Sequence, residues 1–177
     1  MRLEIQKQLN KNQNIILSCT NRTYAKICKG LHKSLPKKLK KICVVTTNKS
    51  SDALIKQFQE WKIDPDKYYF IDCVSAKLQH TKELKNCAYI RSPQYLTGLS
   101  IAIPQILKNK KIEVMVLDNI STLLLYNNEL AVTKFLHHNI TQIKSTNVKA
   151  IYLIMAEDLQ KIVKTVSLFA DAIIEMK

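Results

Sequence analysis

The side chains with the clearest potential for chemistry lie directly after an apolar, strand-like segment. Ile15–Cys19 runs into the polar sequence Thr20-Asn21-Arg22-Thr23, and a helical pattern follows. A strand, a short loop and a helix can bind an anion, because the first backbone N–H groups of a helix have no partner within the helix. Arg22 would add a bidentate donor to such a site. This stretch is therefore a candidate anion site.

Polar side chains also follow two other strand-like segments. Asp72 and Ser75 come after the third segment, and Asp118 and Ser121 come after the fifth. In a parallel sheet, ligands bind where the carboxyl ends of the strands meet. The candidate ligand-binding or anion-binding residues are therefore Thr20, Asn21, Arg22, Thr23, Asp72, Ser75, Asp118 and Ser121.

A simpler interpretation of the first loop stays open. Thr20 or Asn21 would only cap the helix, while Arg22 is solvated or pairs with Asp72 or Asp118. A phosphate-binding loop of the type G-x-x-x-x-G-K-[ST] needs glycines that let backbone N–H groups surround a phosphate, and a lysine that contacts it. The segment 18–24 contains neither residue type. We therefore expect no catalytic residues, no metal site, and no bound ATP or Mg²⁺.

The elements that must position these residues alternate along the chain. Apolar strand-like runs alternate with amphipathic helical patterns, which indicates an α/β fold with a mostly parallel sheet in a three-layer αβα arrangement. One domain is expected over residues 1–177, with residues 1–13 as a flexible or edge segment. Ser92 is expected to cap a helix that Pro104 kinks or ends. The predicted strands are 15–19, 42–47, 68–72, 88–90, 114–117, 150–155 and 172–176.

Several segments, in this order, resemble the RecA/RadA/KaiC branch of the P-loop ATPases. They are VVTTNKSSDALIKQFQEWKID, IEVMVLDNISTLLL and the closing FADAIIEMK. A narrower resemblance is to small archaeal KaiC-like proteins without a Walker A motif. It is carried by NRTY, YYFIDCVS, SPQYLTGLSIAI and LDNISTLLLYN. The resemblance covers the chain from about residue 14 and implies a RecA-like sheet and a tendency to associate with a protein partner or with itself.

The departures from this family bear on activity. By resemblance, Asp118 matches the Walker B aspartate, which holds Mg²⁺ through water. The acidic residues that activate water in KaiC-like ATPases are matched by Asn48 and Lys49, and neither can act as a carboxylate base. Phosphoryl transfer depends on positioned electrostatics, so losing the loop, its lysine and the base together should abolish it. The expectation is a pseudo-ATPase and not an enzyme.

The positive charge is unevenly distributed. The formal net charge is +14, and residues 5–51 contain eleven basic side chains and no acidic one. Such asymmetry favours an anionic partner, although 25 lysines against 3 arginines also fits a compositional bias without function. The candidate polyanion-binding residues are Lys26, Lys29, Lys33, Lys37, Lys38, Lys40 and Lys41. Because αβ loops lie opposite the βα loops, this flank should face away from the candidate anion site.

Three functions are consistent with these patterns. The first is a non-catalytic RecA/KaiC-like domain that serves as a protein-binding, scaffold or regulatory module. The second is a nucleic-acid-associated accessory protein that uses the basic flank Lys26–Lys41, and the third is a non-hydrolysing sensor of a nucleotide or small anion. No apolar run is long enough to span a bilayer, and five unpatterned cysteines suit a reducing compartment, so a cytoplasmic protein is expected.

Overall fold

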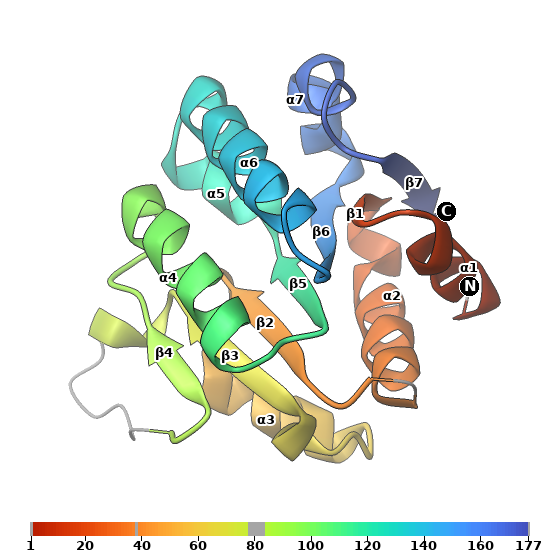
Figure 1. The fold of residues 1–177 in the computed structure, drawn as a ribbon, viewed down its shortest axis with the longest axis vertical. Coiled ribbons are helices and arrows are strands. Elements are labelled where there is room, and N and C mark those ends of the chain that lie inside the picture. The colour runs from red at the N-terminus through yellow and green to blue at the C-terminus, as the bar shows by residue number, and fades with distance from the viewer. Residues whose placement is uncertain (1, 38, 78–83, 177) are drawn as a thin grey trace.

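The core of the protein is a seven-stranded sheet in which each pair of neighbouring strands is parallel (Figure 1). The computed structural model describes residues 2–37, 39–77 and 84–176. The strand order across the sheet is β4-β3-β2-β5-β6-β1-β7. The strands are β1 (Asn14–Cys19), β2 (Ile42–Thr46), β3 (Tyr68–Asp72), β4 (Cys87–Tyr89), β5 (Val114–Asp118), β6 (Lys149–Met155) and β7 (Ala172–Met176).

Helices cover both faces of this sheet (Figure 1). One layer is formed by α1 (Arg2–Lys11), α2 (Asn21–Ser34) and α3 (Ser51–Glu60). The other is formed by α4 (Leu96–Asn109), α5 (Ile120–Tyr126), α6 (Glu129–Lys144) and α7 (Ala156–Val166). Three short 3-10 helices are η1 (Leu35–Lys37), η2 (Pro65–Lys67) and η3 (Ser75–Lys77). The expected three-layer α/β arrangement is confirmed.

Period-two alternation of apolar side chains explains why both faces are covered. Val45 and Leu117 pack against α4 to α7, whereas Val44 and Val116 pack against α1 to α3. Every residue of β2 and β5 is buried, which is typical of central strands in a parallel sheet. The apolar runs in the sequence therefore predicted these strands to within one residue at each end.

Three elements differ from the expectations. Residues 2–11 form a helix instead of a flexible or edge segment, because Ile5 and Leu9 are buried against the first helical layer. Helix α4 begins after Tyr95 rather than after Ser92, and Pro104 lies within it without ending it. The segment after β5, for which no helix was predicted, is the helix α5.

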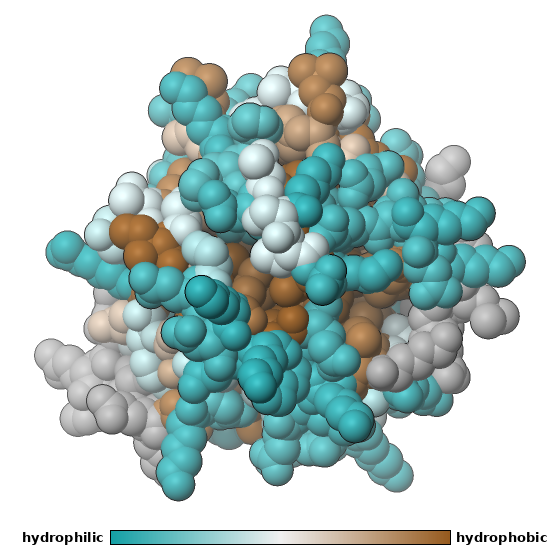
Figure 2. Space-filling view, in the orientation of Figure 1, coloured by the Kyte–Doolittle hydropathy of each residue, from teal (hydrophilic) through white to brown (hydrophobic). Residues whose placement is uncertain are grey.

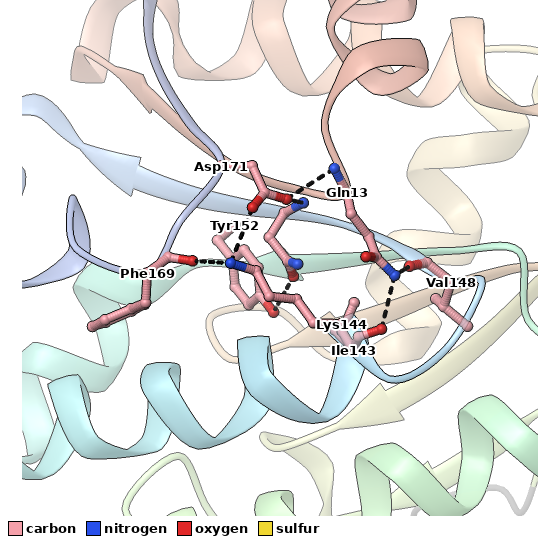
Figure 3. Close-up of polar contacts among 8 residues, drawn as sticks. Gln13, Ile143, Lys144, Val148, Tyr152, Phe169 and Asp171 are labelled. Atoms are coloured by element: carbon pink, nitrogen blue, oxygen red, sulfur yellow. Dashed lines mark hydrogen bonds and ion pairs between the residues drawn. The ribbon is translucent and has the colours of Figure 1, made fainter.

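A polar network ties the amino end of β1 to the α6–β6 loop and to the residues before β7 (Figure 3). The Gln13 side chain donates to the carbonyl oxygens of Ile143, Thr146 and Val148 at 2.7–2.9 Å. The Asp171 carboxylate accepts from the backbone N–H groups of Gln13 and Asn14, and its other oxygen lies 3.1 Å from the Lys144 ammonium. These bonds hold the pKa of Asp171 below its usual value despite the opposing effect of its partial burial.

Hydrophilic side chains cover most of the face shown in Figure 2, and hydrophobic ones show in the hollow between them. Large apolar side chains that stay exposed include Tyr95, Ile101, Leu125, Tyr126, Leu130 and Leu168. Within the described part of the chain, no helix has the length and apolar character that crossing a membrane requires.

Candidate functional site

The loop between β1 and α2 is a helix cap. Thr20 adopts an extended conformation, and its Oγ1 accepts a hydrogen bond from the Thr23 backbone N–H at 3.3 Å. The Thr23 hydroxyl oxygen in turn accepts from the Thr20 N–H at 3.2 Å, which completes a capping box. The Asn21 side chain donates to Glu157 on α7 at 3.2 Å. These contacts occupy the side chains that were candidates for an anion.

Arg22 lies on the exposed side of this helix start. The two ion pairs among the described residues involve other side chains. Arg22 is therefore not paired with Asp72 or Asp118. Of the two interpretations of this loop, the one in which Thr20 caps α2 and Arg22 is solvated describes the structure.

Asp118, at the carboxyl end of β5, is covered by Tyr24 from the first turns of α2. The Tyr24 hydroxyl donates to Asp118 Oδ1 at 2.5 Å, and Asn48 Nδ2 donates to the same hydroxyl at 3.0 Å. Asp118 is 3% exposed. Burial raises the pKa of this carboxyl group to about 6, against the lowering effects of the Tyr24 hydrogen bond and the Lys49 charge. The Tyr24 side chain is therefore the direct partner of the Asp118 carboxyl group.

The backbone after Asp118 is fixed by Thr47. The Thr47 hydroxyl oxygen lies 3.1 and 3.0 Å from the carbonyl oxygens of Asp118 and Asn119, and it accepts from the Asn119 N–H at 2.9 Å. The Asn119 side chain then caps α5 by accepting from the Thr122 N–H at 2.9 Å. The Ser121 hydroxyl accepts from the Met155 N–H at 2.9 Å. The candidate Ser121 thus joins α5 to the end of β6.

Asp72, at the carboxyl end of β3, is saturated with hydrogen bonds. Its two oxygens accept from the backbone N–H groups of Ser51, Val74 and Ser75, and from the hydroxyls of Ser51 and Ser75, at 2.7–2.9 Å. Burial alone would raise its pKa, but these donors outweigh burial and hold the pKa below its usual value. Asp72 therefore holds the start of α3 and the turn after β3 in place.

The two aspartates do not share a site. Thr46 of β2 pairs with Asp72 on one side and with Asp118 on the other, so two strand spacings, about 10 Å, separate the aspartate backbones. A cavity of about 420 Å³ at this end of the sheet is lined by residues after β2, after β3, after β4 and on α5, including Thr47, Asn48, Arg91 and Tyr126. The predicted candidates are not among the residues that line this cavity.

Tyr24 and Thr47 are the site residues that the sequence analysis missed. The Tyr24 hydroxyl group was not predicted as a partner for Asp118. The position itself carries a signal, because a residue in the second turn of a helix after β1 faces the ends of the neighbouring central strands. Thr47 gives no comparable signal, since the pairing of its hydroxyl depends on the backbone after Asp118.

These side chains do not fit a nucleotide with Mg²⁺. The Thr20 hydroxyl is engaged in the capping box, and Asp118 is engaged by Tyr24. Neither glycine nor lysine is present in residues 18–24 to surround a phosphate. In the described ranges, no group of three or more His, Cys, Asp or Glu side chains could hold a metal ion.

Comparisons with known proteins place the fold. No protein-family model matches the sequence, and no curated protein matches it. Among solved structures, the chain is similar to a KaiC-like protein from the hyperthermophilic archaeon Pyrococcus horikoshii OT3, with a TM-score of 0.68 and 13% sequence identity. The match covers 94% of this chain and 74% of that protein. At this identity the likeness defines the fold, which is RecA-like and KaiC-like.

Proposed function

We propose that this RecA-like domain is a binding module without ATP hydrolysis that acts through a protein partner. The observation that carries the proposal is the hydrogen bond from Tyr24 to Asp118. In the KaiC-like family that the sequence resembles, the matching aspartate holds Mg²⁺ through water. Here the carboxyl group is buried, its pKa is raised to about 6, and it has a side-chain donor from the same protein. Asn48 supports the Tyr24 hydroxyl instead of activating water.

Phosphate release from ATP tests the loss of hydrolysis directly. The purified protein with ATP and Mg²⁺ should release no more phosphate than its Asp118→Asn variant, because the residues for positioning phosphates are absent. A rate in the wild type that the Asp118→Asn variant lacks would overturn the proposal.

Thermal denaturation with nucleotides separates the binding module from a nucleotide sensor. A ligand present at one hundred times its Kd stabilises a protein by about 2.7 kcal/mol, which is readily seen as a rise in Tm. We expect no rise with ATP or ADP, with or without Mg²⁺. A saturable rise without phosphate release would identify a non-hydrolysing sensor instead.

Exposed apolar side chains near α5 support a protein partner. Leu125 is 76% exposed and Leu130 is 65% exposed, with Tyr126 beside them in the chain. Grouped apolar side chains on a surface are typical of protein contacts. The net charge of +14 disfavours association of two copies, so we favour a different, acidic protein with an apolar contact surface. A reducing cytoplasm, which suits five unpaired cysteines, is the proposed location.

Light scattering tests the nature of that partner. The wild type should be monomeric at low and at high ionic strength. A dimer that the double variant Leu125→Ser with Leu130→Ser loses would show that the partner is a second copy, and would overturn the choice of a different protein.

Association with nucleic acid is a second candidate function. The exposed lysines of α2 and η1 are Lys26, Lys29, Lys33 and Lys37, and Lys40 and Lys41 are exposed directly before β2. Lys38 lies outside the described residues. None of these described lysines forms an ion pair with another described residue. Salt-dependent retention of nucleic acid by the wild type, weakened when these lysines are replaced by serine, tests the candidate.

A further inference from the structure

A cleft lies at the amino end of the sheet, on the opposite side from Asp118. It is formed where the last turn of α2 and η1 meet the end of α3 and η2, and its volume is about 780 Å³. Its lining includes Lys33, Lys37, Lys62, Lys67, Trp61 and His32. These side chains come from two segments that are far apart in the sequence, so only the fold brings them together.

The charge of this cleft favours an anion. Four lysines line it against one carboxylate, that of Asp64, which already accepts a hydrogen bond from the Asp66 backbone N–H. Lys67 donates to the Pro36 carbonyl oxygen at 3.0 Å, which holds its ammonium group at the wall. Lys33, Lys37 and Lys62 are exposed and have no ion pair among the described residues. Phosphate groups are the anions that such a cluster of lysines attracts.

An aromatic ring lies beside these lysines. Trp61 is half-buried, with its ring centroid 6.3 Å from that of Phe58, which anchors it on the core. Lys29 of α2 places its ammonium group 5.9 Å from the Trp61 ring centroid. An anchored, half-buried indole next to lysines is the combination that single-stranded nucleic acid uses, with a base on the ring and phosphates on the charges.

His32 adds a polar group to the wall of the cleft. Its ring packs between Phe58 and Tyr68, with centroids at 4.9 and 5.7 Å, and the residue is 1% exposed. Burial lowers its pKa to about 3, so the imidazole is neutral at physiological pH. Among the described residues, Nδ1 has no hydrogen-bond partner.

We propose that this cleft binds one nucleotide unit of a single-stranded nucleic acid. The base stacks on Trp61, and the flanking phosphates contact Lys33, Lys37, Lys62 and Lys67. The proposal rests on the second candidate function. The strand continues along the solvent face of α2, where Lys29 and Lys26 are exposed one and two turns before the cleft. A free nucleotide carries the same chemistry, and the experiment separates the two sources.

Trp61 is the single tryptophan of the chain, so its fluorescence reports on this cleft alone. Titration of the protein with a short oligothymidylate at low salt should quench the fluorescence in a saturable way, because the base stacks on the indole. Thymidine monophosphate in a parallel titration should bind far more weakly, since it offers one phosphate. Equal affinity for the monophosphate would overturn the strand as the occupant in favour of a free nucleotide.

Matched variants separate the lysines of the cleft from lysines on the opposite helical layer. The double variant Lys33→Ser with Lys37→Ser removes two phosphate contacts. Each contact contributes about 0.7 to the slope of log K against log salt, so the slope should become less steep by about 1.4. Lys134→Ser with Lys164→Ser removes the same charge from exposed positions on α6 and α7 and should leave the slope unchanged. Equal slopes in the two variants would overturn the role of the cleft lysines.

Trp61→Ala should weaken oligothymidylate binding, measured by anisotropy of a labelled strand, by about 5- to 100-fold. Trp61→Phe keeps an aromatic ring and the packing on Phe58, and should retain most of the affinity. Unchanged binding in Trp61→Ala would overturn the cleft and leave the flank as the binding surface. Absence of any salt-dependent binding by the wild type would overturn both the cleft and the second candidate function.

Discussion

Asp72 and Asp118 occupy equivalent positions in the sheet and differ in every other respect. Both end a buried strand, both pair with Thr46, and both point to the helical layer that contains α2 and α3. Asp72 accepts five hydrogen bonds, and its pKa is lowered. Asp118 accepts one from a side chain, and its pKa is raised to about 6.

The difference shows what a buried carboxylate needs in order to stabilise a fold. Removing the group from water costs free energy, and hydrogen-bond donors must offset that cost. At Asp72 the start of α3 and the turn after β3 supply backbone donors. At Asp118 the donor among the described residues is the Tyr24 hydroxyl. Asp72 thus holds two neighbouring segments in place, whereas Asp118 is a buried carboxyl group with one side-chain donor and a raised pKa.

Replacement of Asp72 should have the largest effect. Asp72→Ala would leave the buried N–H groups of Ser51 and Ser75 without an acceptor, so we expect a loss of about 4 kcal/mol in the free energy of unfolding. Because the folded pKa is lowered, the stability that Asp72 contributes is present above pH of about 4 and is lost as the pH falls. Urea denaturation at pH 7 measures the effect, and a loss below about 1 kcal/mol would contradict the structural role.

Asp118→Asn should raise the free energy of unfolding, whereas Asp72→Ala lowers it. A raised folded pKa means that the neutral acid is favoured, so the wild type loses stability as the pH rises from about 4 through about 6. Asparagine stays neutral and still accepts from Tyr24. The free energy of unfolding of the variant should exceed that of the wild type by up to about 3 kcal/mol at pH 8, and the two should be equal at pH 4. Urea denaturation at the two pH values tests this, and a variant less stable than the wild type at pH 8 would refute it.

Tyr24→Phe isolates the one side-chain donor to Asp118. The variant keeps the ring and removes the hydroxyl, so it should lose about 2 kcal/mol at pH 8, where the carboxylate is charged, and less at pH 4. The pKa of Asp118, followed by carbon NMR of the carboxyl group, should rise above its wild-type value of about 6. An unchanged pKa would show that the hydrogen bond from Tyr24 does not stabilise the charged form of Asp118.

Ser51→Ala should have the smallest effect of the four. It removes one of the five donors to Asp72 and leaves the Ser51 backbone N–H bond intact, so we expect a loss of about 1 kcal/mol. The measurement is again urea denaturation at pH 7. A loss as large as that of Asp72→Ala would mean that the Asp72 network fails as a unit.

Much of the fold was predictable from local patterns. The apolar runs Val114–Leu117 and Ala150–Met155 indicated buried parallel strands, and the structure confirms them as β5 and β6. The start of α4 was not predictable in the same way, because Ser92 and Pro93 match a cap pattern while the helix begins after Tyr95. Local cap signals compete with the tertiary position of the chain, and here the tertiary position decides.

The candidate site was predictable only in part. The sequence placed Thr20, Asp72 and Asp118 at strand ends, because strand boundaries follow from local hydrophobicity. It did not reveal that Tyr24 would cover Asp118, or that Ser51 and Ser75 would saturate Asp72. Such pairings join residues on different elements, and their distances depend on how α2 and α3 pack on the sheet.

By itself, the sequence determined the α/β alternation, the missing glycine and lysine of a phosphate loop, and the excess of lysine before residue 51. These are properties of residue type and local order. The tertiary structure decided which aspartate is satisfied, which is covered by a tyrosine, and that Trp61 lies beside Lys33 and Lys37. Contacts between distant segments form only when apolar burial packs the helices on the sheet, so no local pattern contains them.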